Sequence, residues 1–135
     1  MSHGPSSPGT RPLVEAIWRA AVQAVDSTRL VRQAIRVEDG QLVIARQAIP
    51  IAKLRHIEVV GAGKAGAGMA WGAEESLSDL NKPITGWVNV PADCVRSLKS
   101  IHLHPARPAG INEPTEAGVA GSGGLIDSRW ASGMQ

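Results

Sequence analysis

The chain has 135 residues, which is enough for one domain with a buried core. Its formal net charge is +2, with no basic run and no basic residues interleaved with aromatic ones, so nothing in the composition supports nucleic-acid binding. No apolar stretch approaches the length of a membrane span, and Cys94 is the only cysteine, which excludes an internal disulfide. We therefore expect a cytoplasmic protein with neither nucleic-acid nor membrane partners.

The first part of the chain is predicted to be helical after a disordered leader. Residues 1–12 are rich in Pro, Gly and Ser and lack the apolar segment of a signal peptide. Apolar residues recur at helical spacing over residues 13–25, and Asp26 can cap a second short helix that reaches Ile35. We predict a helical pair in which Trp18 is a packing residue.

A β-hairpin is predicted next, over residues 37–45 (VEDGQLVIA). Asp39 and Gly40 lie between short apolar runs, and this dipeptide favours a two-residue hairpin turn because both positions need positive φ. We interpret it as an ordinary surface hairpin.

The segment VVGAGKAGAGMA, residues 59–70, carries the strongest functional signal. It predicts a buried strand that ends in a tight glycine turn, followed by a helix over residues 64–77. Gly61 and Gly63 let the backbone approach a ligand closely, and the first N–H groups of a helix have no intrahelical partner. Lys64 adds a positive charge that opposes the helix dipole, so its presence favours a functional role. The segment therefore predicts an anion-binding site.

A dinucleotide site is one interpretation of this turn, because three glycines satisfy the pattern G-x-G-x-x-G. That fingerprint also needs an acidic residue about 20 positions further on, at the end of the next strand. Asp79 has roughly this spacing but lies in a predicted helix end and loop. The next predicted strand, residues 86–90, ends in Asn89 and Pro91 instead. The acidic partner is therefore missing from its expected place.

A Walker P-loop is excluded, because Glu58 stands where its first glycine belongs and Ala65 replaces the Ser or Thr that would hold magnesium. A third interpretation is that Lys64 meets a transferring phosphoryl group or an anionic substrate, since charge neutralisation and positioning are most of what phosphoryl transfer needs.

Three short strands are predicted over residues 57–60, 86–90 and 100–103, with a helical turn over residues 93–99. Their alternation with helices predicts a parallel sheet in an α/β fold. Ligands in such sheets bind at the carboxyl ends of the strands. This rule places the glycine turn, the end of the second strand and the segment after the third on one rim.

The segment HPARPAGINEPTEAG, residues 104–118, is predicted to be a long polar loop that opens a new helix at Glu116. Asn112 and Glu113 near its end are candidate substrate contacts facing Lys64, and the alternative is a plain rim loop with a helix cap. His102 precedes the loop and alternates with His104 on one strand face. Two histidines do not make a metal site, so we predict none.

The order of these segments resembles the glycerate 2-kinase family, whose members are often labelled hydroxypyruvate reductases. The resemblance runs from about residue 10 to residue 122. Its most specific piece is the GAGKA turn with the small-residue helix that follows. The other pieces are an opening helical segment that ends in AVDSTRLVRQAI, the hairpin VEDGQLVI, the strand GWVNVP and the loop HPARPAGINEPTEAG.

This resemblance implies ATP-dependent phosphorylation of D-glycerate to 2-phosphoglycerate, with ATP and Mg²⁺ as cofactors. It implies a Rossmann-like domain joined to a second domain, with the active site between them. The catalytic lysine of the family turn falls on Lys64, where it would neutralise the phosphoryl group or orient the glycerate hydroxyl. Gly61, Gly63, Asn112 and Glu113 are the predicted nucleotide- and substrate-binding residues.

The end of the chain departs from the family, whose members continue into a long helix, a strand and a Ser/Gly-rich nucleotide loop. Here glycines follow the helix opened at Glu116, and we expect them to break it. We expect an incomplete Rossmann-like domain over residues 13–122, a divergent tail over residues 123–135, and a truncated, inactive kinase fragment. The exposed sheet would favour self-association. An NAD(P)H-dependent hydroxypyruvate reductase and a non-catalytic nucleotide- or phosphate-binding module remain the alternatives.

Overall fold

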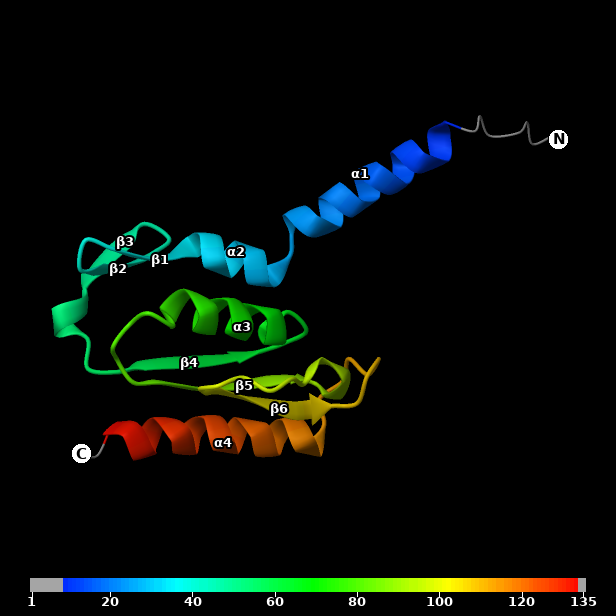
Figure 1. Cartoon of the computed structure of the whole chain (residues 1–135). Coiled ribbons are helices and arrows are strands. Elements are labelled where there is room, and N and C mark those ends of the chain that lie inside the picture. The colour runs from blue at the N-terminus through cyan, green and yellow to red at the C-terminus, as the bar shows by residue number, and fades with distance from the viewer. Residues whose placement is uncertain (1–8, 134–135) are drawn as a thin grey trace.

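A parallel three-stranded sheet organises the molecule. The computed structural model describes residues 9–133. Strands β4 (Ile57–Ala62), β5 (Ile84–Pro91) and β6 (Ile101–Arg107) lie side by side in the order β4-β5-β6, and both pairings are parallel. Helices cover both faces of this sheet, with α3 on one side and α4 on the other (Figure 1). The predicted α/β class with a partial parallel sheet is therefore confirmed.

Helix α3 (Gly66–Leu77) packs on the sheet through small side chains. A Cβ at Gly66 would lie 2.8 Å from a methyl group of Val88, so a glycine is what lets the helix approach this closely. The helix begins at Gly66 rather than at Lys64, which corrects the predicted start. The main core lies between helix and sheet, and its buried members are Ala67, Ala70, Val88, Val90, Ile101 and Leu103.

Helix α4 (Glu116–Gly133) packs on the opposite face, against β5 and β6. It is continuous, so the expectation that its glycines would break it is wrong. A Cβ at Gly124 would lie 2.6 Å from the ring of Trp87, and one at Gly121 would overlap Asn89 and His104. These glycines therefore make room for bulky side chains on the sheet, and this packing outweighs their low helix propensity.

The connections within the sheet are shorter than predicted. Only a 3₁₀ turn, Ala92–Cys94, follows β5, in place of the helical turn predicted over residues 93–99. Strand β6 continues to Arg107, so the first residues of the predicted long loop are extended. Pro105 lies within β6, and a proline is tolerated there because β6 is at an edge of the sheet, where not every N–H needs a partner.

The predicted hairpin is present and extends into a separate antiparallel sheet. It consists of β1 (Ile35–Glu38), β2 (Gln41–Ile44) and β3 (Gln47–Pro50), of which β3 was not predicted. Asp39 and Gly40 have φ values of 50° and 71°, as the hairpin turn requires. A second cluster of buried residues ties this sheet to the end of α3, and its members are Leu42, Leu77 and Leu80.

The two N-terminal helices behave differently. Asp26 caps α2 (Ser27–Ala34) as predicted, because its carboxylate accepts a hydrogen bond of 2.8 Å from the backbone N–H of Arg29. Helix α2 packs on α3, where the Thr28 hydroxyl donates a hydrogen bond of 3.0 Å to the carbonyl of Gly68.

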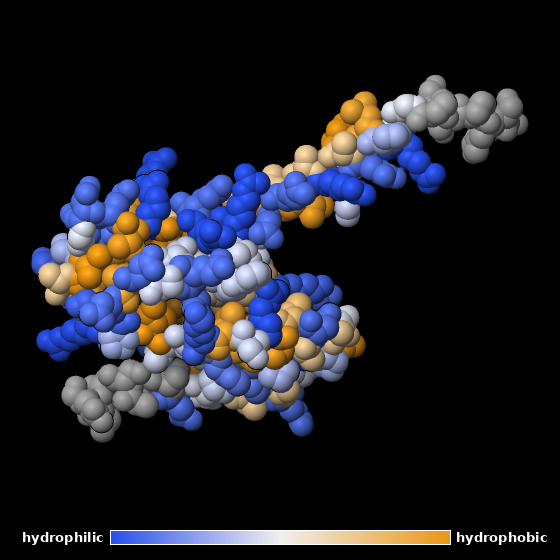
Figure 2. All heavy atoms as spheres, in the orientation of Figure 1, coloured by the Kyte–Doolittle hydropathy of each residue, from blue (hydrophilic) through white to orange (hydrophobic). Residues whose placement is uncertain are grey.

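Helix α1 (Thr10–Ala24) projects away from the rest of the molecule (Figure 1). None of its residues is buried, and Trp18 is 66% exposed, so the prediction of Trp18 as a packing residue is wrong. Apolar side chains are visible along this helix between polar ones (Figure 2). The helix begins within the predicted leader, of which residues 1–8 lie outside the described part of the chain. No helix in the described part is both long and apolar enough to cross a bilayer.

Candidate anion-binding site

The carboxyl ends of the three parallel strands meet at one rim, as the sequence predicted. Ala62 of β4 is in register with Asn89 of β5, and Pro91 of β5 is in register with Arg107 of β6. A hollow of about 340 Å³ opens at this rim. Its lining comes from the glycine turn, both strand ends and the loop before α4, and comprises Ala62, Gly63, Asn89, Val90, Pro91, Ala106, Arg107, Asn112, Glu113, Pro114, Thr115 and Gly118.

The glycine turn has a defined backbone geometry. Gly63 has a φ of 124°, a conformation that side chains rarely adopt, and its N–H donates a hydrogen bond of 2.9 Å to the carbonyl of Asn89. The N–H of Gly66 donates in turn to the carbonyl of Gly63, at 3.1 Å. Gly61 is less constrained, because an added Cβ would make an ordinary contact 3.6 Å from Val88. Of the two predicted glycines, Gly63 is the one that lines the hollow.

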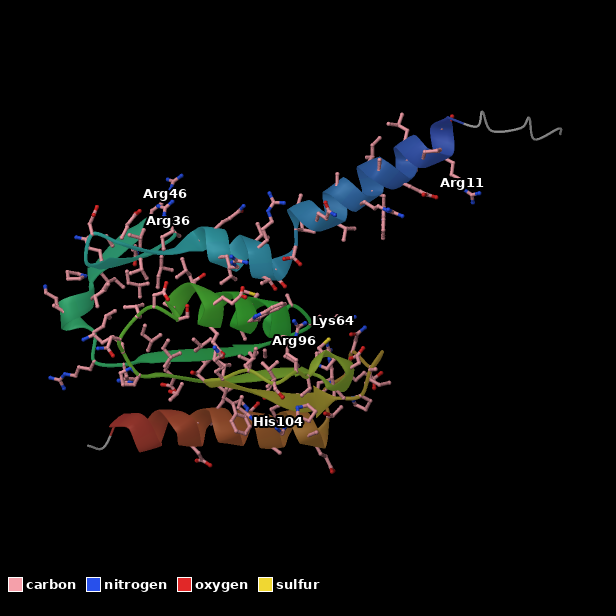
Figure 3. The ribbon with its side chains drawn as sticks, viewed as in Figure 1. Arg11, Arg36, Arg46, Lys64, Arg96 and His104 are labelled. Carbon is pink, nitrogen blue, oxygen red and sulfur yellow. The ribbon has the colours of Figure 1, made fainter. Side chains whose placement is uncertain are left out.

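Lys64 lies in the turn itself, one residue before the N-cap of α3, Ala65. It is exposed, and no described residue forms a hydrogen bond or an ion pair with its ammonium group. Its side chain does not line the hollow, although its neighbour Gly63 does. Figure 3 shows Lys64 at the same end of the molecule as Arg96, whose guanidinium carbon lies 5.1 Å from the ring centroid of Trp71.

The loop before α4 is anchored at its end by Thr115. Its hydroxyl donates to the carbonyl of Ala106 and accepts a hydrogen bond of 3.1 Å from the N–H of Gly118, which caps the helix. Asn112 and Glu113 precede this anchor and line the same hollow as Gly63. The structure therefore brings together the glycine turn and the two loop residues that the sequence singled out, and their roles stay a prediction.

Arg107 is a feature of the hollow that sequence reasoning missed. It is partly buried at the last position of β6 and lines the same hollow as Gly63. The sequence predicts a loop from residue 104, whereas β6 continues to Arg107. Arg107 therefore occupies the carboxyl end of a strand, which is where ligands bind in parallel sheets.

His102 and His104 alternate on one strand face, as predicted, but they lie outside the hollow. The ring of Trp87 is 4.3 Å from that of His102 and 5.3 Å from that of His104, measured between centroids. The Nε2 atom of His104 is 2.9 Å from the carbonyl oxygen of Ala117. His104 and Trp87 therefore belong to the contact between the sheet and α4, and the exposed His102 lies beside Trp87.

Comparison with known proteins matches residues 13–130 to the family DUF4147, described as a domain of unknown function. The fold is similar to the crystal structure of the PH0495 protein from Pyrococcus horikoshii OT3, with a TM-score of 0.62 and 23% sequence identity over 87% of this chain. The chain spans about a quarter of that protein, covering 25% of its length. No curated protein matches.

Proposed function

This chain belongs to the DUF4147 family, and we propose that it provides the part of a glycerate 2-kinase that carries Lys64 and binds D-glycerate. DUF4147 is the N-terminal domain found in proteins of the glycerate 2-kinase family. The observation that carries the proposal is the rim hollow, in which Gly63 of the GAGKA turn lies with Asn112 and Glu113. We place the reaction in the cytoplasm, because a chain with a lone cysteine suits a reducing compartment.

Lys64 is the proposed catalytic residue. Its ammonium group lies at the carboxyl end of β4 without a partner among the described residues, so its charge is free to meet an incoming anion. During phosphoryl transfer from ATP, Lys64 would neutralise charge on the transferred group or orient the acceptor hydroxyl of glycerate. Gly63 has a φ of 124°, which side chains rarely adopt, and the space around the place of its Cβ is open, with nothing within 4 Å.

Magnesium is not accounted for within this part of the chain. The described residues contain no group of three or more His, Cys, Asp or Glu side chains that could hold a metal ion. We therefore assign no metal ligand to this part of the chain. We propose that the metal and the rest of the nucleotide site are held by residues beyond these, and that this chain alone does not catalyse the reaction.

The hydroxypyruvate reductase alternative is less well supported by the geometry. A dinucleotide fold needs an acidic residue at the end of its second strand to bind the ribose hydroxyl. Strand β5 ends at Pro91, and Asn89 near that end is buried, with its amide oxygen accepting a hydrogen bond of 3.0 Å from the indole of Trp87. A phosphate-binding module without catalysis needs only the glycine turn and stays an alternative.

The test combines activity and binding on the purified chain. We expect no 2-phosphoglycerate from D-glycerate, ATP and Mg²⁺, but saturable binding of D-glycerate and ATP by NMR. Lys64→Ala should weaken ATP binding by roughly tenfold, because it removes a charged contact. The control is Lys53→Ala, a lysine in the 3₁₀ turn after β3.

Three outcomes would count against the proposal. Turnover by the wild-type chain that Lys64→Ala abolishes would show that no further part is needed. Oxidation of NADH with hydroxypyruvate would favour the reductase. Binding of ATP without any binding of D-glycerate would favour the phosphate-binding module.

A further inference from the structure

Three of the polar residues that line the rim hollow have side chains without a partner among the described residues. Arg107, Asn112 and Glu113 all line it, and none of them forms a hydrogen bond or an ion pair with a described residue. The other polar side chains of the same lining are engaged, because Asn89 is bonded to Trp87 and Thr115 to the backbone around it. The polar groups left over are therefore a guanidinium, an amide and a carboxylate, gathered around one space.

Arg107 is the unusual member of this group, because it is partly withdrawn from water. A charge that loses hydration is costly unless it is paired. Glu113 lines the same hollow, yet the two side chains form no ion pair. A guanidinium presents its N–H groups as a planar fork that matches a carboxylate with two parallel hydrogen bonds. A ligand carboxylate would thus give Arg107 the partner that the protein does not provide.

Glu113 and Asn112 restrict the rest of the ligand. An ionised carboxylate only accepts hydrogen bonds, and an amide can both accept and donate, so both suit a ligand hydroxyl. The negative charge of Glu113 disfavours a doubly charged phosphate group in the same space. A hollow of about 340 Å³ suits a small molecule.

We propose that Arg107 binds the carboxylate of a small hydroxy acid in this hollow, while Asn112 and Glu113 contact its hydroxyl groups. This inference rests on the proposed function, because it takes the hollow as the place of the organic substrate. It adds a direction to the site: the carboxylate lies toward the end of β6, and the hydroxyls lie toward the loop before α4. Arg107 thereby determines specificity for acids over neutral polyols.

The experiment is an NMR titration of the full-length ¹⁵N-labelled chain, which follows the backbone signals and the Nε–Hε signal of Arg107. The probes are D-glycerate, L-lactate, glycerol and inorganic phosphate. We expect D-glycerate and L-lactate to shift the Arg107 signal, and glycerol, which lacks a carboxylate, to bind at least about tenfold more weakly. Arg107→Gln should weaken D-glycerate binding by about tenfold or more, and Arg107→Lys should recover part of the loss as a point charge without the fork.

Arg96→Gln is the matched control. Arg96 lies at the same end of the molecule as Lys64 (Figure 3), it contacts Trp71, and it does not line the hollow. It should leave D-glycerate binding unchanged. A general effect of net charge would weaken binding in both glutamine variants and would overturn the proposal. If Arg107→Gln does not fold, the Nε–Hε signal of the wild-type chain and the D-glycerate affinity of the Arg107→Lys variant still test the carboxylate contact.

The outcomes separate this inference from the proposed function. D-glycerate binding that Arg107→Gln leaves intact would overturn the inference and leave the kinase proposal standing. Arg107-dependent binding of L-lactate without D-glycerate binding would support the carboxylate contact and overturn the kinase substrate. Arg107-dependent binding of phosphate alone, or no binding of any probe, would overturn the inference.

Discussion

The two faces of the parallel sheet present different side chains to the helices that cover them. Under α3 the sheet presents aliphatic side chains, and alanines of the helix pack on them, with a close contact at Gly66. Under α4 the sheet presents the rings of Trp87 and His104, and glycines of the helix lie over them. The size of the sheet side chains therefore determines how small the helix residues must be. A glycine-rich run is a helix-packing surface where the opposing face is bulky.

The sharpest test of this comparison uses two glycines of α4 that lie two residues apart. Gly121→Ala would place a methyl group against Asn89 and His104, and we expect a loss of about 1–3 kcal/mol in unfolding free energy from overpacking. Gly123→Ala meets nothing within 4 Å and should stabilise the helix by up to about 1 kcal/mol. Urea denaturation followed by circular dichroism measures both. Equal effects of the two substitutions would show that α4 does not rest on the sheet through Gly121.

The features of the fold that the sequence predicted have local causes, and those that it did not predict depend on tertiary contacts. The Asp26 cap, the hairpin turn at Gly40 and the strand and turn before α3 depend on neighbours in sequence, and all were predicted. Strand β3 was missed. The continuity of α4 depends on contacts with residues such as Trp87, which helix propensity does not contain.

The candidate site divides in the same way. Gly63, Asn112 and Glu113 were predicted from turn and loop chemistry; the structure places them around one hollow, and their roles stay a prediction. Arg107 was missed because the prolines around it indicate a loop, whereas parallel pairing with β5 extends β6 as far as that residue. Lys64 was predicted as a site residue from its charge next to the glycines. The sequence also placed it at the first position of the helix, whereas α3 begins at Gly66 and Lys64 lies in the turn before it.

A second test compares two tryptophans. Trp87 lies between the sheet and α4, and its indole N–H donates to the buried amide of Asn89. Trp87→Phe leaves that amide oxygen without its donor, so we expect a loss of about 1–3 kcal/mol. Trp71 on α3 is 42% exposed, and its ring contacts the guanidinium of Arg96. Trp71→Phe should therefore lower the unfolding free energy by less than about 1 kcal/mol. Thermal unfolding monitored by near-ultraviolet circular dichroism ranks the two, and a reversed order would contradict the assignment of Trp87 to the packed interface.

We expect the smallest effects on stability at the exposed edge strand β4 and on helix α1. Self-association of the chain is therefore the quantity to measure there. Strand β4 is an edge of the described sheet, Val60 on it is 46% exposed, and we propose that copies of the chain associate through this edge. Val60→Lys should shift sedimentation equilibrium toward the monomer and change the unfolding free energy by no more than about 0.5 kcal/mol. Ile17→Lys is the matched change on α1, where the side chain is 61% exposed and no residue of the helix is buried. If Ile17→Lys dissociates the chain and Val60→Lys does not, the contact lies on the projecting helix. A wild-type chain that is monomeric at all concentrations would show that neither surface mediates self-association.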